Sequence, residues 1–143
     1  MLKKFLNKYY PPFINLYTVW ILYMMFFAFY RGLTAETYII RANPFESIYF
    51  LMFDSGYSLY EMYKNIFGNI ILFVPYGFLG ILYPKFNFYK YLFLVFVIVI
   101  NILEFSQYYF GRGYAEFDDV MLNTFGMSIG YIIYKKWFFI RGR

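Results

Sequence analysis

Long apolar runs, each separated from the next by a charged segment, dominate this chain. Residues 13–30 carry no charge, and eighteen helical residues extend about 27 Å, close to the thickness of the hydrocarbon core of a bilayer. Three more runs, each with at most three charged residues, cover about 66–83, 90–110 and 119–137. The chain is 62% hydrophobic and 15% charged, which is too apolar for a soluble domain of this length. We therefore predict four transmembrane helices.

The basic residues predict how these helices are oriented. Of the 13 lysines and arginines, nine lie in three segments without an acid, at 3–8, 85–90 and 135–143. The other four lie in segments that also hold acids. Positively charged loops stay in the cytoplasm, so we expect a multi-pass protein of the cytoplasmic membrane with both termini cytoplasmic. No nucleic-acid-binding motif accompanies the net charge of +5, so we expect no nucleic acid partner.

The predicted fold is one all-α membrane domain over residues 1–143, with four transmembrane helices in a compact bundle. The connection between the first two helices is long, and its middle, 45–53, is apolar. That stretch is much too short to span a bilayer. We expect it to form an outer interfacial or re-entrant segment.

Local signals predict where two of the helices begin and bend. Pro11 and Pro12 directly precede the first apolar run, where proline suits a helix start. Ser58 and Glu61 have the spacing of a capping box, so the second helix should begin near them. Pro75 should bend that helix and free a carbonyl that needs a buried partner.

The chain contains no cysteine and no histidine. This absence removes thiol nucleophiles, imidazole bases and the usual zinc sites. Any chemistry must use carboxylates, amides, arginine and tyrosine. No cofactor is evident, although carboxylate oxygens could hold a divalent cation, whose identity the residues leave open.

Polar residues from three predicted helices fall at a similar depth below the outer surface. Counting along each helix places Glu104 about 9 Å, Asn123 about 6 to 8 Å and Asn69 about 5 Å below its outer end. A charged residue within the membrane costs at least about 2.5 kcal/mol on insertion scales. An intramembrane glutamate therefore needs a partner or a function.

Spacing in the third predicted helix supports a polar face. Asn101, Glu104 and Gln107 follow one another at intervals of three, which predicts one face. Arg112 lies just above them, on the short loop before the fourth helix. It is the expected counter-ion for Glu104 or Asp119, because an arginine–carboxylate pair would hold both groups in place.

The fourth predicted helix has a polar face that continues into small residues. Asp119, Asn123, Gly126 and Gly130 fall on one side, and the glycines would allow a neighbouring helix to approach closely. Structural roles stay open at this point. Asp118 is placed to cap its own helix, and buried asparagines often serve as hydrogen bonds between helices.

Several motifs in this order resemble the VanZ-like family of bacterial membrane proteins, over about 41–131. The residues that carry the resemblance are Arg41-x-Asn43-Pro44-Phe45, Asn69-x3-Phe73-x-Pro75-x-Gly77-Phe78, Glu104-x2-Gln107, and Arg112-x5-Asp118-Asp119-x3-Asn123-x2-Gly126. The resemblance implies a small multi-spanning protein of the bacterial cell envelope, and the founding member is linked with low-level resistance to teicoplanin. Glu116 departs from the pattern of many members, so the resemblance assigns it no role.

Three hypotheses follow for function. The first is an outward-facing site that engages a membrane lipid or a lipid-linked cell-wall precursor and changes glycopeptide susceptibility; its ligand-binding residues would be Arg41, Asn69, Gln107, Arg112 and Asn123. The second is an enzyme, with or without a metal, acting on a lipid-linked or phosphorylated substrate; its catalytic residues would be Glu104, Asp118 and Asp119. The third is a non-catalytic structural module that binds an envelope partner or a second copy of itself.

Overall fold

The computed structural model describes residues 2–27, 40–54, 56, 58–112 and 115–139. Within them, the α-helices are α1 (Leu2–Phe26), α2 (Glu46–Tyr49), α3 (Leu59–Phe73), α4 (Tyr89–Tyr109) and α5 (Phe117–Ile133). Tighter 3-10 turns form η2 (Val74–Ile81) and η3 (Pro84–Asn87), and wider π turns form η1 (Phe50–Asp54) and η4 (Tyr134–Phe139). The two-residue strands β1 (Ile40–Arg41) and β2 (Ala115–Glu116) pair in parallel. The all-α prediction holds for the described residues except at this short strand pair.

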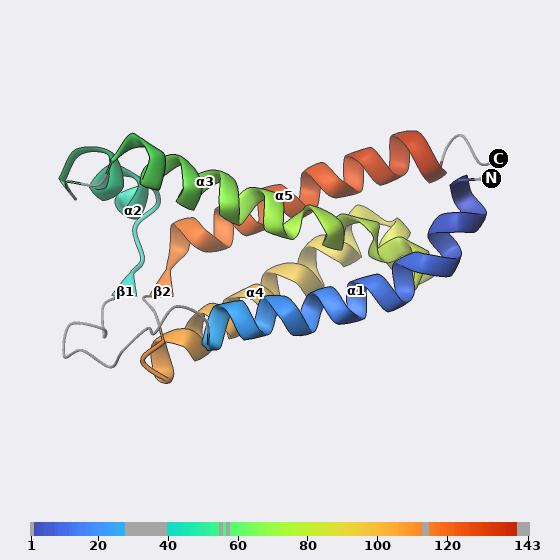
Figure 1. Ribbon diagram of the computed structural model, residues 1–143, viewed down its shortest axis with the longest axis horizontal. Helices are drawn as coiled ribbons and strands as arrows, with labels where there is room; N and C mark the ends of the chain where they lie inside the picture. The colour runs from blue at the N-terminus through green and yellow to red at the C-terminus, as the bar shows by residue number, and fades with distance from the viewer. Residues whose placement is uncertain (1, 28–39, 55, 57, 113–114, 140–143) are drawn as a thin grey trace.

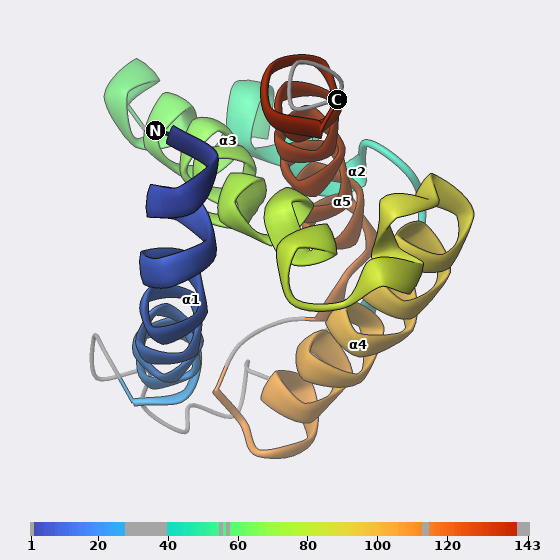
Figure 2. The same ribbon diagram turned by 90° about the vertical axis from the view of Figure 1, so that its right-hand side faces the viewer.

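The four long helices α1, α3, α4 and α5 lie alongside one another and alternate in direction along the chain (Figures 1 and 2). The start of α1 and the end of η4 lie at one end of the molecule, which we call the terminal end (Figure 1). The segments α2, β1 and β2 lie at the opposite end, which we call the loop end (Figure 1). Every connection between long helices therefore reverses the chain, as a multi-pass topology requires.

Glycines bring α5 into backbone contact with α3 and η2. A Cβ atom added at Gly126 would overlap the carbonyl of Ile70, and one added at Gly130 would overlap the carbonyl of Val74. A Cβ on Gly77 in η2 would in turn meet the backbone of Tyr131. The predicted close approach is confirmed, because these helices cross where no side chain separates them.

The helix that contains Pro75 changes type rather than continuing as an α-helix. It is α-helical up to Phe73 and becomes the 3-10 segment η2 from Val74 onward. Two carbonyls in this region accept hydrogen bonds from α1: Tyr17 donates to Leu72 and Tyr10 donates to Pro75, each at 2.8 Å. A buried tyrosine, Tyr10, and a half-buried one, Tyr17, thus satisfy backbone groups near the change of helix type.

The start of the first helix differs from the prediction. α1 begins at Leu2, so Pro11 and Pro12 lie inside it rather than at its start. Tyr10, in the turn just before the prolines, is buried and bonded to the carbonyl of Pro75. This tertiary contact stabilises a turn that proline alone would disfavour. The predicted end of the first span, 28–30, lies outside the described residues.

Two described helices are long and apolar enough to cross a membrane: Met62–Ile81, with mean hydropathy 1.3, and Tyr89–Tyr109, with mean hydropathy 1.8. They coincide with the predicted spans at 66–83 and 90–110. α3 begins at Leu59, directly after Ser58, and α4 ends just before Gly111. The spans predicted at 13–30 and 119–137 overlap α1 and α5–η4, and they stay predictions.

Large apolar side chains cover the outside of the helices as well as the interior. A buried core joins Ile21, Phe73, Leu92, Phe96, Ile100, Val120 and Met127. Outward-facing positions on the long helices are equally apolar, among them Leu16, Ile71, Ile98, Phe125 and Ile132. So extensive an apolar surface is typical of protein that contacts a membrane or a partner.

Candidate functional site

Two of the predicted site residues pair in the interior between α4 and α5. Glu104 and Asn123 are 6% and 2% exposed, and the amide nitrogen of Asn123 donates to Oε1 of Glu104 at 3.4 Å. The amide oxygen of Asn123 is buried and accepts no hydrogen bond within the described part of the chain. An unsatisfied buried acceptor costs free energy. This oxygen is therefore suited to receive an O–H or N–H group.

A second polar pair lies one helical turn away. Asn69 on α3 donates from its amide nitrogen to Oδ1 of Asp119 on α5 at 2.7 Å. Asp119 precedes Asn123 by four residues, so both project from the same face of α5. We call Asn69, Glu104, Asp119 and Asn123 the polar layer. The structure thus brings together polar residues from three helices at one level of the molecule.

Asp118 points away from the polar layer and binds backbone amides at the start of α2. It is 2% exposed, and its carboxylate accepts hydrogen bonds from the amides of Phe45 at 2.5 Å and Ile48 at 3.0 Å. The N-cap residue of its own helix is Glu116, without a side-chain cap. Asp118 therefore caps a distant helix rather than its own. This contact positions the α2 segment against α5.

Arg41 also connects the loop end to the start of α5. Its guanidinium forms a salt bridge with Glu116 at 2.8 Å, and the two side chains are only 17% and 12% exposed. The same guanidinium lies 4.5 Å from the ring centre of Phe50, a cation–π distance. Arg41 and Glu116 face each other as partners in the β1–β2 pair. Arg41 thus stabilises the loop end.

Gln107 and Arg112 lie where α4 ends. The amide nitrogen of Gln107, which is buried, donates to the carbonyl of Met25 on α1 at 2.8 Å. The backbone amide of Arg112 donates to the carbonyl of Gln107, and that of Gly111 to Tyr108. With Gly111 at φ 62°, this is the Schellman ending of a helix. It places the half-buried Arg112 directly beyond the last turn of α4.

The predicted polar face of α4 is wrong at Asn101. Its side chain is exposed, and its amide donates to the carbonyl of Val97 one turn earlier on the same helix. Glu104 and Gln107 are both buried. Each step of three residues falls short of a full turn, so two steps separate Asn101 from Gln107 by about 120°. Only the last two residues face the interior.

The three carboxylates proposed for catalysis do not form a metal site. Among the described residues, no group of three or more carboxylate, histidine or cysteine side chains gathers closely enough to hold a metal ion. Asp118 is directed to α2, whereas Glu104 and Asp119 belong to the polar layer. The structure therefore does not bring Glu104, Asp118 and Asp119 together as a cation site. Carboxylate catalysis by Glu104, Asp118 and Asp119 stays a prediction.

Sequence reasoning missed two contributors to this region. Glu116, to which the resemblance assigns no role, is the salt-bridge partner of Arg41. Ser47 on α2 is 3% exposed, and its hydroxyl has no partner within the described residues. No sequence pattern pointed to Ser47, because α2 is a four-residue helix without a periodic signal. Only the opposite charges of Arg41 and Glu116 could have predicted their contact from the sequence.

A model of the VanZ/LLP1 family matches residues 13–140, which is nearly the whole chain. The chain belongs to the VanZ/LLP1 family. The match extends the predicted resemblance from 41–131 to both sides, so that it includes the part of α1 from residue 13 onward and all of η4. Neither a curated protein nor a solved structure matches the chain. Membership in the VanZ/LLP1 family, together with two helices apolar enough to cross a membrane, points to a membrane protein.

Proposed function

We propose that this VanZ/LLP1 protein crosses the bacterial cytoplasmic membrane four times, with its terminal end in the cytoplasm. The charges of the described residues support this orientation. Six lysines lie in the segments at the terminal end: Lys4, Lys8, Lys85, Lys90, Lys135 and Lys136. The acids Glu46, Glu116, Asp118 and Asp119 lie in segments at the loop end. Under the positive-inside rule, the loop end and the polar layer then face outward.

We further propose that the polar layer engages the headgroup of a membrane lipid or a lipid-linked cell-wall precursor. The observation that supports this most directly is the unsatisfied amide oxygen of Asn123 beside the buried carboxylate of Glu104. A headgroup hydroxyl or amine would donate to these acceptors. Arg112, held just beyond Gln107, would bind the phosphate. Engagement of such a component would change susceptibility to teicoplanin-type glycopeptides, which bind cell-wall precursors.

The test compares teicoplanin susceptibility of bacteria that express the wild type or single variants at matched membrane abundance. Glu104→Gln and Arg112→Ala should return susceptibility to the level of cells without the protein. Asn101→Ala is the matched control, because Asn101 is an exposed polar residue on the same helix. It should keep the wild-type phenotype. Full resistance in Glu104→Gln and Arg112→Ala at normal abundance would refute the proposed site.

A structural module is the second candidate, because several predicted site residues already bond within the chain. Asp118 binds the backbone of α2, Gln107 binds the carbonyl of Met25, and Asn69 binds Asp119. If packing is the function of the polar layer, every loss of resistance should follow a loss of protein from the membrane. Measuring abundance and susceptibility in the same cells separates the two candidates.

A further inference from the structure

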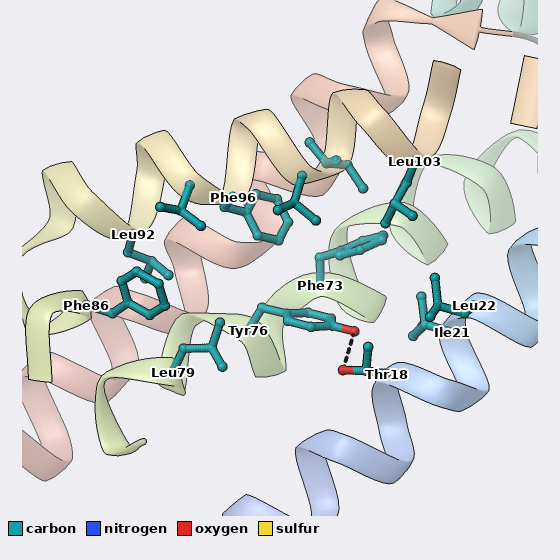
Figure 3. Close-up of a pocket in the computed structure, with 13 residues that line it drawn as sticks. Thr18, Ile21, Leu22, Phe73, Tyr76, Leu79, Phe86, Leu92, Phe96 and Leu103 are labelled. Atoms are coloured by element: carbon teal, nitrogen blue, oxygen red, sulfur yellow. Dashed lines mark hydrogen bonds between the residues drawn. The ribbon is translucent and has the colours of Figure 1, made fainter. Parts of the chain in front are cut away.

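A groove of about 170 Å³ lies between α1, α3–η2 and α4. Figure 3 shows its walls: Thr18, Ile21 and Leu22 from α1, Phe73, Tyr76 and Leu79 from α3–η2, and Leu92, Phe96 and Leu103 from α4. The hydroxyls of Tyr76 and Thr18 bond to each other at 3.1 Å, and Thr18 donates in turn to the carbonyl of Ile14. The groove therefore presents only hydrocarbon.

Hydrocarbon is the occupant that this lining can accept. An engineered apolar cavity of similar size, roughly 150 Å³, stays dry and takes up apolar molecules. Water would be held poorly here, because both lining hydroxyls already donate their protons within the protein. An empty groove would leave buried side chains such as Leu92 and Ile100 without dispersion contacts on one side.

The groove opens toward the outside of the molecule along α4. Val95 and Val99 line it and are 42% and 48% exposed. In a chain that spans the membrane, this side of α4 contacts the acyl chains of the bilayer. The molecules with direct access to the groove are therefore membrane lipids.

One end of the groove reaches the level of the polar layer along α3 and α4. Leu103 in its wall precedes Glu104, and Phe73 follows Asn69 by one helical turn. Near this level, the hydrogen bond from Gln107 to Met25 joins α4 to α1. A chain lying in the groove would therefore bring its headgroup toward the polar layer.

From this placement we propose that the groove binds one acyl chain of a membrane phospholipid whose headgroup reaches the polar layer. The inference depends on the proposed function for its membrane setting and its headgroup site. A groove for the acyl chain would let the protein select lipids by the length and shape of their hydrocarbon chains, which the headgroup site alone would not do. Binding should therefore require both ends of the lipid.

The test measures binding of palmitoyl-oleoyl-phosphatidylglycerol to the purified full chain in detergent by native mass spectrometry. Val99→Phe and Leu22→Phe insert bulk into the groove, and Ile98→Phe adds the same bulk on the outer side of α4. The groove variants should weaken binding about tenfold or more, the effect expected when a hydrophobic pocket is filled. Ile98→Phe should bind like the wild type. Thermal unfolding checks that each variant is folded.

The outcomes separate this inference from the proposed headgroup site. Wild-type binding by folded Val99→Phe and Leu22→Phe would overturn the groove assignment, whatever Arg112→Ala does. Weaker binding in the groove variants with unchanged binding in Arg112→Ala would support the groove and refute the headgroup site. Dihexanoyl-phosphatidylglycerol, whose chains are short, should bind more weakly than the long-chain lipid and be insensitive to Val99→Phe. A lipid-free dimer that Val99→Phe abolishes would assign the groove to a second copy and overturn the proposal.

Discussion

The side-chain amide of Asn123 donates a hydrogen bond to the carboxylate of Glu104, and both groups are buried between α4 and α5. At 3.4 Å the bond is longer than a charge-assisted hydrogen bond usually is. Asn123 also keeps one unsatisfied amide oxygen. The amide of Asn123 is therefore less completely satisfied than most buried polar groups, as expected of a group that completes its hydrogen bonds with a ligand.

Removing the amide should destabilise the protein, because Glu104 would lose a donor in a buried position. We expect Asn123→Ala to lower the free energy of unfolding by about 1–3 kcal/mol. Thermal unfolding in detergent measures this change. Asn101→Ala, which removes an exposed amide from α4, should leave the midpoint nearly unchanged. Equal midpoints for the two variants would show that the buried pair contributes nothing to stability.

Asp118→Asn should release the α2 segment, because an amide accepts backbone N–H bonds less strongly than a carboxylate. Two bonds are affected, to Phe45 and Ile48, and hydrogen bonds to a charged acceptor contribute about 1.5–3 kcal/mol. Limited proteolysis should then cleave the chain between 45 and 54 faster than in the wild type. Asp119→Asn serves as the comparison, since Asp119 bonds to α3. Equal cleavage rates in the two variants would contradict the assigned role of Asp118.

Gly126→Ala should disrupt the contact of α5 with α3, because the new methyl group meets the backbone carbonyl of Ile70. Overpacking of this kind costs about 1–3 kcal/mol. Gly68→Ala is the matched control on α3, since a Cβ there meets nothing within 4 Å. That variant should be neutral or more stable by up to about 1 kcal/mol. Unfolding midpoints in detergent distinguish the two, and a neutral Gly126→Ala would show that the helices can separate without cost.

The spacing of small residues predicted this interface, whereas the polar contacts were only partly predictable. Gly126 and Gly130 lie four residues apart on the face that begins at Asp119. This spacing is enough to predict that a neighbouring helix packs closely there. Asn101 shared the interval of three with Glu104, but that interval drifts around a helix. Asn101 therefore faces outward while Glu104 is buried. This difference is visible only in the folded structure.

The role of Asp118 could not be derived from local rules. An aspartate in a first turn predicts a cap for its own helix, yet its partners are amides 70 or more residues earlier. Those amides belong to a helix of four residues, whose N-cap Phe45 has φ 65°. A non-glycine residue rarely adopts this conformation. A helix of four residues is too short to show a periodic pattern in the sequence.

Arg41 and Glu116 should show coupled effects on stability. The salt bridge is mostly buried and the guanidinium also contacts the ring of Phe50. A double-mutant cycle with Arg41→Ala and Glu116→Ala should give a coupling energy of about 0.5–3 kcal/mol. Arg41→Lys should recover only part of it, because lysine lacks the planar guanidinium. Strict additivity of the single effects would mean that the ion pair does not hold the loop end together.

The central claim is that the polar layer binds a lipid headgroup, and an experimental structure with co-purified lipid retained tests it most directly. We predict headgroup density between α3, α4 and α5, with a donor atom within hydrogen-bond distance of the amide oxygen of Asn123. The same density should be absent from Arg112→Ala prepared in the same way. A wild-type structure in which lipid density surrounds the helices, while Asn123 and Glu104 contact only protein, would contradict the claim.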